Sequence, residues 1–260
     1  MTTTKRASGA PRTTKLAVPR AAVTPAVKKS PTAPGQVANI VATTSVRPPQ
    51  LAAATIAEMF RRFHAHEPEP KGELEHSNPF TLLVAVVLSA QATDAGVNKA
   101  TRELFKAAST PAAMVALGEE AVRDYIKTIG LFRNKAKHVL ALSQQLITAH
   151  GGVVPQNRDA LVALPGVGRK TANVVLNMAF GMATMAVDTH VFRVANRTGL
   201  GPGKDVNVVE QALLKAVPER YALHAHHWLI LHGRYTCLAR KPLCGSCRVK
   251  DLCRFDDKTA

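Results

Sequence analysis

The segment LPGVGRKT, residues 164–171, decides how this chain folds, and the apolar segment ANVVLNMAF, residues 172–180, follows it directly. Gly166 and Gly168 permit a tight turn and a close approach of the backbone to a partner. The helix that begins after the turn points unpaired backbone N–H groups and the positive end of its dipole toward the loop. We therefore interpret the segment as a hairpin between two helices.

This hairpin favours binding to a backbone phosphate over a purely structural role. Helix N-termini are ready sites for phosphate groups, and Arg169 and Lys170 add two positive charges. A tight helix–helix corner, whose glycines serve packing alone, is the structural alternative. In a chain this basic, the phosphate interpretation is preferred. The G-x-x-x-x-G-K spacing of a nucleotide-binding P-loop is absent.

The segments on both sides of the hairpin follow helical periodicity as well. Asn78 followed by Pro79 predicts a capped helix start, and the apolar residues 80–88 predict a central, buried helix. Residues 221–235 close the helical part. Because no stretch shows convincing strand-like alternation and no internal repeat is evident, we predict an all-α protein of about ten helices.

The charge of the chain has two sources. The 260 residues carry a formal net charge of +16. Residues 1–50 hold eight Lys or Arg, seven Pro and no Asp or Glu, a composition that predicts a disordered basic tail. The other 210 residues carry 26 basic and 18 acidic side chains, a further +8. A polyanionic partner is therefore expected, with nucleic acid ahead of a membrane surface.

Two other classes of protein are disfavoured at this point. No run of about 18 apolar residues exists, and no apolar region follows Met1, so neither a membrane-spanning helix nor a secretory signal is predicted. For the tail, an arm loosely attracted to DNA is preferred over an organelle-targeting peptide, because its prolines oppose the amphipathic helix that such peptides need.

All four cysteines lie in one short cluster with the spacing Cys237-x6-Cys244-x2-Cys247-x5-Cys253. A disulfide framework would be spread over the domain, so a metal centre is expected. Structural zinc sites usually use two C-x2-C pairs, whereas [4Fe–4S] clusters use four thiolates at varied spacing. The spacing alone leaves both open. The loop also carries basic residues suited to DNA contact: Arg240, Lys241, Arg248, Lys250 and Arg254.

Several polar residues have a structural and a functional interpretation. Asp188 precedes a predicted helix, where capping is the common role, and it would be catalytic only if it faced a cleft. Lys170 is one of 34 basic residues, and a lysine acts as a nucleophile only when its amine is neutral. His226, His227 and His232 lack the spacing and acid of a zinc protease helix, which favours structural or phosphate-contacting roles.

The hairpin, the string VDTH at residues 187–190 and the cysteine loop occur together and in this order. In that combination the chain resembles the endonuclease III family, the helix-hairpin-helix DNA glycosylases that carry an iron–sulfur cluster. The resemblance covers about residues 51–255. It extends to three further strings: LSAQATD at residues 88–94, YIKTIGL at 125–131 and HWLILHGR at 227–234.

The resemblance implies an enzyme of base-excision DNA repair. Such an enzyme is a bifunctional DNA N-glycosylase that removes oxidised pyrimidines from double-stranded DNA, and an AP lyase that cleaves 3′ to the abasic site by β-elimination. Lys170 matches the family's nucleophile, which forms a Schiff base, and Asp188 matches its catalytic aspartate. The cysteines would hold a [4Fe–4S] cluster rather than zinc. The implied DNA-binding residues are Gln91, Leu131, Gly166, Gly168, Arg169, Lys241 and Arg248.

Among those residues, Gln91 and Leu131 match side chains that fill the space left by a flipped nucleotide. The family architecture implies two helical lobes with a cleft between them, a six-helix domain with the hairpin over residues 72–183 and an iron–sulfur domain over 51–71 plus 184–255. It also implies a monomer in the bacterial cytoplasm, at the nucleoid and without membrane contact.

Three rival functions differ in specific features. A monofunctional glycosylase of the adenine-excising type would lack Lys170 and carry a further C-terminal recognition domain, whereas this sequence runs only seven residues past Cys253. A DNA-binding module without catalysis would not need Asp188 beside a lysine. An electron-transfer protein would not need the hairpin or the basic surface.

Overall fold

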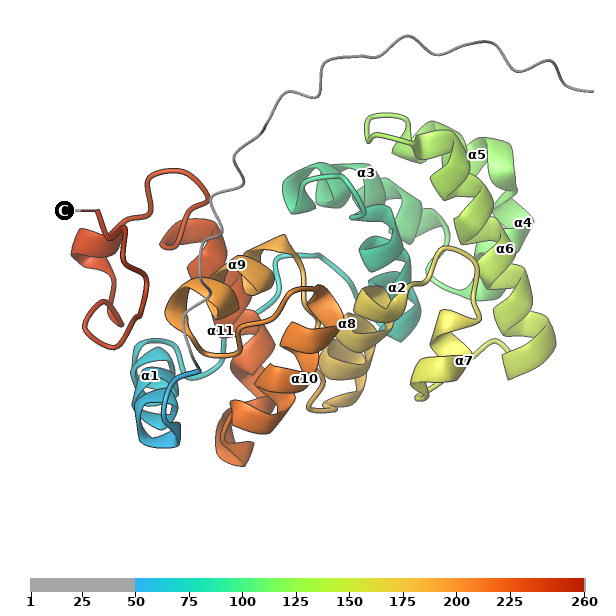
Figure 1. Cartoon of the computed structure of the whole chain (residues 1–260). Coiled ribbons are helices and arrows are strands. Elements are labelled where there is room, and N and C mark those ends of the chain that lie inside the picture. Colours follow the sequence, from blue (N-terminus) through green and yellow to red (C-terminus); the bar gives the residue numbers. More distant parts are fainter. Residues whose placement is uncertain (1–49, 260) are drawn as a thin grey trace, which may run out of the picture. The chain divides into compact units, whose positions relative to one another are not determined.

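The computed structural model describes residues 50–259, so the predicted tail over residues 1–50 lies outside the described residues except for its last position. Every regular element in the described part is helical, which confirms the all-α prediction (Figure 1). None of the helices in that part has the length and apolar character that a membrane-spanning helix needs.

The elements are α1 (Ala53–His66), α2 (Pro79–Leu88), α3 (Asp94–Ala107), α4 (Pro111–Leu117), α5 (Glu119–Ile126), α6 (Phe132–His150), α7 (Arg158–Val162), α8 (Arg169–Phe180), α9 (Thr189–Thr198), α10 (Val206–Ala216) and α11 (Ala222–Tyr235), with the short 3-10 helices η1 (Glu219–Tyr221) and η2 (Cys244–Ser246).

Helix α2 is the central helix that its apolar sequence predicts. Its start is a capping box, in which the Thr81 backbone N–H donates to Asn78 Oδ1 at 2.9 Å and the Asn78 N–H donates to Thr81 Oγ1 at 3.0 Å. Pro79 occupies the first helical turn, where no N–H is needed. Every residue after Pro79 in α2 is buried. The helix packs against α3, α6 and α8.

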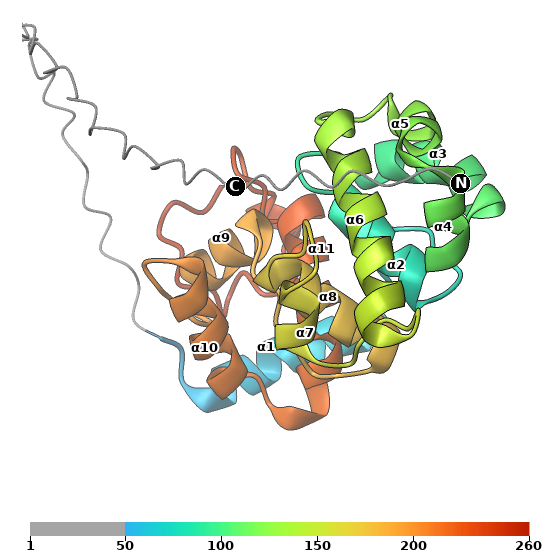
Figure 2. The ribbon, with the colours of Figure 1, turned by 90° about the vertical axis from the view of Figure 1, so that its right-hand side faces the viewer.

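The buried side chains form two separate hydrophobic clusters. The first joins α2 through α8 and includes Ala186. The second joins α1 with α9, α10 and α11, and it includes Met185 and Val249. Helix α1 therefore packs with the C-terminal helices although it lies at the other end of the described sequence (Figures 1 and 2). The chain passes from the first cluster to the second between α8 and α9.

Aromatic contacts fix α1 in the second cluster. Phe60 stacks on Tyr221 with ring centroids 6.1 Å apart and packs against Trp228 at 6.2 Å. The Trp228 indole N–H donates to the Glu67 carbonyl at 2.8 Å, just past the end of α1. Buried aromatic pairs of this kind contribute about 0.5–1.5 kcal/mol beyond their area.

Helix α8 carries a polar stripe on an otherwise apolar helix. Arg169, Asn173 and Asn177 follow one another at four-residue spacing and so share one helix face. The Asn177 amide donates to the carbonyls of Met182 at 3.0 Å and Leu223 at 2.9 Å. This stripe links α8, whose apolar residues belong to the first cluster, to elements of the second cluster.

Replacing Leu83 with Ala tests whether α2 is the centre of the fold. Leu83 is fully buried, so the substitution should lower the free energy of unfolding by about 2–5 kcal/mol. Urea denaturation measures the change. Leu214→Ala, at a side chain that is 42% exposed on α10, is the matched control and should change stability by less than about 0.5 kcal/mol. Equal effects of the two substitutions would contradict the central position of α2.

Candidate active site

The predicted hairpin lies between α7 and α8. Gly166 has φ +78°, and a Cβ added to it would lie 2.9 Å from the Cβ of His138 on α6. Glycine is therefore required at this position by both the backbone conformation and the contact with α6. Gly168 differs, because a Cβ added there would meet nothing within 4 Å. It caps α8 without a side-chain acceptor, so the first N–H groups of α8 have no capping partner.

Lys170 and Asp188 line the same cavity. Lys170 lies in the first turn of α8, and Asp188 lies immediately before α9. The cavity measures about 1330 Å³, including the part open to solvent, and Gln91 also lines it. The structure thus brings together three of the residues singled out in the sequence, from the α2–α3 loop, α8 and the start of α9.

Asp188 does cap its helix, as the structural interpretation predicts. Its Oδ1 accepts hydrogen bonds from the backbone N–H groups of His190 at 2.9 Å and Val191 at 2.8 Å. The side chain is also partly exposed and lines the cavity. Asp188 can therefore cap α9 and also line the cavity, because both N–H groups donate to the same carboxylate oxygen.

Arg169 is the residue whose environment differs most from the one expected. Its guanidinium forms a bidentate ion pair with the buried carboxylate of Glu210 on α10, with Nε–Oε2 at 2.8 Å and Nη2–Oε1 at 2.7 Å. The pair raises the pKa of Arg169. The expectation that Arg169 adds an uncompensated charge to the hairpin is therefore wrong, since Glu210 neutralises it.

The cavity also has polar lining that the sequence analysis did not identify. Arg234 on α11 donates to Asp94 Oδ2 at 2.5 Å and also pairs with Glu73. Asp94 and Arg234 line the cavity together with Ser89. The sequence analysis assigned no role to Asp94 or Arg234, which are 140 residues apart along the chain, so no local pattern could have indicated this pair.

Three of the predicted DNA-binding residues have left-handed backbone conformations. The φ angles are +55° at Gln91, +59° at Leu131 and +50° at Lys241, and among residues 50–259 no other non-glycine residue has a positive φ. Such conformations are unfavourable for residues with a Cβ and concentrate at functional sites. Leu131 is also 57% exposed. A Cβ added to Gly130 would lie 3.8 Å from the Gln91 carbonyl, so the loops of Gln91 and Leu131 are neighbours.

Two buried histidines share a cavity with Lys170. His226 and His227 line a second, smaller cavity that Lys170 also borders, and the Nδ1 atoms of both have no hydrogen-bond partner among the described residues. Burial first, and then the charges of His227 and Lys170, lower the pKa of His226 to about 3. Both imidazoles are therefore neutral at physiological pH, and their structural or phosphate-contacting role stays a prediction.

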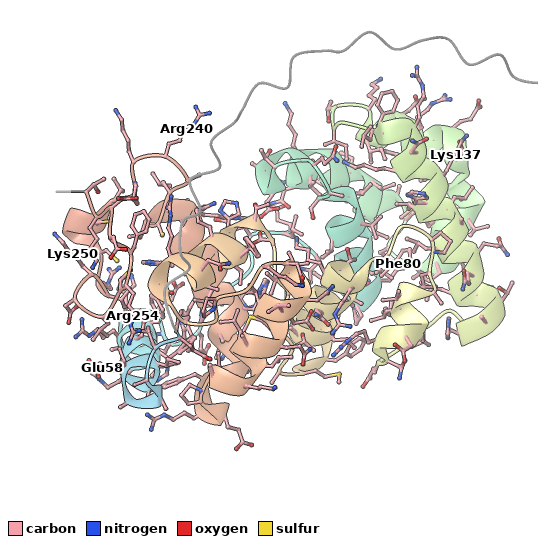
Figure 3. All side chains as sticks on the ribbon, in the orientation of Figure 1. Glu58, Phe80, Lys137, Arg240, Lys250 and Arg254 are labelled. Atoms are coloured by element: carbon pink, nitrogen blue, oxygen red, sulfur yellow. The ribbon has the colours of Figure 1, made fainter. Side chains whose placement is uncertain are left out.

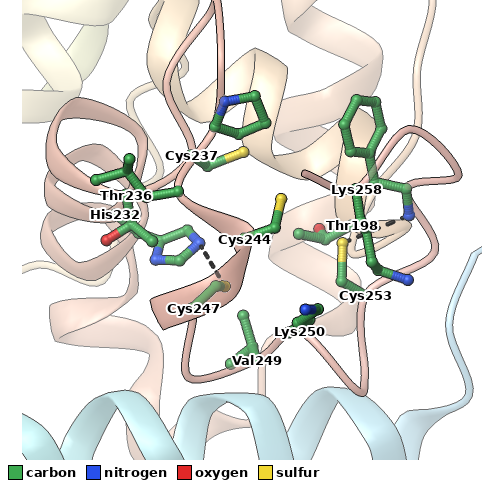
Figure 4. Close-up of a pocket in the computed structure, with 13 residues that line it drawn as sticks. Thr198, His232, Thr236, Cys237, Cys244, Cys247, Val249, Lys250, Cys253 and Lys258 are labelled. Atoms are coloured by element: carbon green, nitrogen blue, oxygen red, sulfur yellow. Dashed lines mark hydrogen bonds between the residues drawn. The ribbon is translucent and has the colours of Figure 1, made fainter. Parts of the chain in front are cut away.

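The four cysteine side chains surround one cavity in the C-terminal loop (Figure 4). The cavity measures about 350 Å³, including the part open to solvent, and none of the four cysteines forms a disulfide. Across residues 50–259, no three Cys, His, Asp or Glu side chains converge closely enough to hold a single metal ion. Four thiolates around one cavity are a donor set that suits a [4Fe–4S] cluster as well as a zinc ion.

Hydrogen bonds to the sulfurs add to this fit. The Phe255 backbone N–H donates to Cys253 Sγ at 3.4 Å, and Arg197 Nη1 donates to Cys237 Sγ at 3.7 Å. The His232 ring lies 3.8 Å from Cys247 Sγ (Figure 4). N–H donors of this kind stabilise thiolate ligands. Burial raises the pKa of the Cys247 thiol, so a cationic cluster is what would hold it as a thiolate.

The remaining predicted DNA-binding residues lie away from the Lys170 cavity. Lys241 and Arg248 are exposed on the cysteine loop, in the same region as the labelled Arg240, Lys250 and Arg254 (Figure 3). The loop is attached to α1 through Arg62, whose guanidinium donates to the Arg248 carbonyl at 2.8 Å. The cysteine loop therefore carries a second basic surface, separate from the hairpin.

Comparison with known proteins bears directly on this arrangement. Residues 84–219 match the HhH-GPD superfamily of base excision DNA repair proteins, and residues 237–253 match the iron–sulfur binding domain of endonuclease III. Endonuclease III of Escherichia coli strain K12 is 59% identical over 201 residues, which cover 77% of this chain and 95% of the relative. The Haemophilus influenzae endonuclease III is 58% identical over the same shares. The chain belongs to the endonuclease III family.

Solved structures of the family agree with the fold. A trapped covalent endonuclease III–DNA intermediate matches with a TM-score of 0.74 at 46% identity, over 79% of this chain and 97% of that one. A thermostable thymine-DNA glycosylase matches with a TM-score of 0.68 at 25% identity, over 78% of this chain and 94% of that one. As a member of this family, the protein is a bifunctional DNA glycosylase and AP lyase of base excision repair. Its cysteine loop is the site of a [4Fe–4S] cluster, which confirms iron–sulfur over zinc.

Substituting Cys247 with Ser should remove the cluster. We expect the unaltered endonuclease III chain to contain about four irons, and the variant to lose iron and melt at a lower temperature because metal binding couples to folding. Elemental analysis and thermal melting measure both effects. Ser246→Ala, an exposed neighbour in the same loop, is the control and should keep its iron. One zinc and no iron in the unaltered protein would overturn this expectation.

Acid should destabilise the fold through His226. Its pKa is about 6.5 when unfolded and about 3 when folded, so stability is complete above pH 6.5 and falls as the unfolded state takes up the proton. At pH 5 the loss is about 2 kcal/mol. His226→Phe should flatten the dependence of melting temperature on pH between 7.5 and 5, whereas His66→Phe, at an exposed site, should not. An unchanged slope in His226→Phe would contradict the buried neutral imidazole.

Proposed function

We propose that Lys170 is the nucleophile and Asp188 the electrostatic partner of a reaction that removes oxidised pyrimidines from double-stranded DNA and then cleaves the strand. The observation that carries this proposal is that both side chains line one solvent-open cavity, the cavity to which a flipped nucleotide would have access. Among residues 50–259, no other lysine lines that cavity.

Each step of the proposed reaction can be assigned to a bond. The neutral Lys170 amine attacks C1′ of the flipped nucleotide, and the bond from C1′ to the base breaks with its electron pair leaving on the base. The nitrogen of the amino sugar passes a proton to the departed base. The C1′–O4′ bond then breaks, the ring oxygen takes up a proton from water, and a protonated Schiff base remains between C1′ and Lys170. Loss of a proton from C2′ then expels the 3′ phosphate by β-elimination. Water hydrolyses the imine and returns Lys170.

Asp188 would stabilise the positive charge that develops on the sugar. Two backbone N–H groups hold its Oδ1, so the carboxylate is positioned before substrate arrives. Preorganised charge of this kind needs no rearrangement during the reaction and contributes strongly in a partly desolvated site. The cap of α9 thereby serves as the scaffold of the catalytic group.

The hairpin would bind a backbone phosphate mainly through N–H groups. Because Arg169 is paired with Glu210, the uncapped start of α8 supplies the donors and the dipole. Open space around Gly168 supports this role, since the chain itself does not require glycine there, whereas a phosphate close to the backbone would. Lys241 and Arg248 would contact phosphates from the cysteine loop.

Gln91 and Leu131 would occupy the space left in the duplex. Their loops are adjacent, and their left-handed backbones hold one polar and one apolar side chain in exposed positions. Inserting such a pair offsets the loss of stacking when a nucleotide is flipped.

The two hydrophobic clusters support a division into two lobes, residues 72–183 and residues 51–71 plus 184–255. We further propose that the protein acts as a monomer on damaged DNA in the bacterial cytoplasm, at the nucleoid and without membrane contact.

Lys170→Gln should abolish covalent trapping by borohydride on a duplex that contains an abasic site. The glutamine amide cannot form a Schiff base, while damaged DNA should still bind because the hairpin N–H groups remain. Trapping is scored on a denaturing gel. Lys215→Gln, at an exposed site on α10, has the same charge change and should trap normally. Full trapping by Lys170→Gln would mean that another amine is the nucleophile.

Asp188→Asn and Asp188→Ala separate catalysis from capping. Asparagine caps helices well, so Asp188→Asn should slow turnover with little change in melting, whereas Asp188→Ala should also lose about 0.5–2 kcal/mol of stability. Single-turnover base excision and thermal melting distinguish these effects. If Asp188→Asn excised the base at the original rate, Asp188 would be a helix cap and nothing more.

A further inference from the structure

Glu210 is a buried carboxylate that lies outside the lining of the Lys170 cavity and is nevertheless bonded to the helix that carries Lys170. It belongs to α10, and its side chain is only 5% exposed. Burial of a carboxylate is unfavourable unless charge-assisted hydrogen bonds replace its water shell. The contacts that Glu210 makes therefore explain why a charge is kept at this position.

The first contact fixes the start of α8. Both nitrogen donors of Arg169 bind both oxygens of Glu210, at 2.8 and 2.7 Å. A bidentate pair restricts the distance and also the relative orientation of the two planar groups. Because Arg169 immediately precedes Lys170, this pair holds the helical turn from which Lys170 projects.

The second contact of Glu210 is with Asn173, which also binds the segment that precedes Asp188. The Asn173 amide donates to Glu210 Oε1 at 3.3 Å and to the Met185 carbonyl at 3.0 Å. The Thr184 hydroxyl in turn donates to the Asn173 carbonyl at 2.6 Å. The extended residues 184–187, which run directly into Asp188, are thus bound to the same face of α8 as the Arg169–Glu210 pair.

We infer that Glu210 is a positioning residue of the repair reaction, holding Lys170 through Arg169 and Asp188 through Asn173 at one cavity. The inference rests on the roles proposed above for Lys170 and Asp188. Only the Glu210 side of the pair is buried, because the Arg169 side chain is 43% exposed. Fold stability alone does not require the pair, since apolar replacements of ion pairs that include buried charges are often neutral or stabilising. Catalysis does require it, because small displacements of reacting groups are costly in rate.

Glu210→Gln in the cluster-loaded full chain tests this role. We expect the single-turnover rate of strand cleavage, on a duplex with one abasic site and at saturating enzyme, to fall about 10- to 100-fold. The Kd for the same duplex should stay equal or decrease, because the substitution removes a negative charge from a protein that binds a polyanion. Slower chemistry together with unweakened binding is not expected of a residue that only stabilises the fold.

Glu75→Gln is the matched control. Glu75 also forms a bidentate pair, with Arg102 at 2.8 and 2.6 Å, but on the exposed surface and away from the cavity. The charge change is the same, so this variant should cleave at the original rate. A comparable loss of rate in Glu75→Gln would assign the effect to net charge and overturn the inference.

A double variant separates positioning from stability. Arg169→Met with Glu210→Leu leaves no buried unpaired charge, so its melting temperature should stay close to that of the unaltered protein, and its cleavage should remain slow. Rates within twofold of the original in both Glu210 variants would show that Glu210 positions nothing. A loss of rate that only follows the unfolded fraction would overturn the inference as well. Covalent trapping of the Lys170→Gln variant on DNA would instead refute Lys170 as the nucleophile, whatever the Glu210 variants show.

Discussion

The polar stripe of α8 is the constraint on which the rest of the structure depends. The fold has two hydrophobic clusters, and the apolar residues of α8 belong to the first of them. What joins them along α8 is a set of hydrogen bonds from Arg169, Asn173 and Asn177 to α10, to the segment before α9 and to α11. Hydrogen bonds are directional and poorly tolerant of displacement, so this junction fixes the position of one cluster relative to the other.

Backbone strain in the described residues is concentrated in exposed loops. In residues 50–259, the non-glycine residues with positive φ are Gln91, Leu131 and Lys241, and all three belong to exposed loops. Each left-handed conformation costs about 1–3 kcal/mol. Such strain persists only if the flanking structure enforces it. Leu131 illustrates this, because it lies between the turn after α5 and the long helix α6, which is anchored in the first cluster by its buried residues.

How much the sequence could predict depended on whether the pattern was local. The capped start of α2 at Asn78 and Pro79 and the cysteine cluster are local patterns, and the structure has both. The predicted hairpin was also found, although α8 begins at Arg169, so that Lys170 lies within its first turn.

Contacts between distant residues could not be predicted in the same way. The sequence shows Arg169 as a free cation beside Lys170, whereas its partner Glu210 is 41 residues away. The Asp94–Arg234 pair spans 140 residues. Such pairs depend on how the helices pack against one another, and no periodic pattern in a single sequence predicts that packing. The left-handed backbone conformations of Gln91 and Leu131 were not predicted either, because Gln and Leu do not favour that conformation.

The polar junction also explains why a cavity can exist between the helices at all. Two apolar faces brought together would close, because water is excluded from them and dense packing is favourable. Polar side chains such as Asn173 and Glu210 instead bind each other and the backbone at fixed distances, which leaves room for the solvent-open cavity at one end of the junction. The same bonds hold the α8 turn that carries Lys170 and the segment that leads into Asp188, and both of these side chains line the solvent-open cavity.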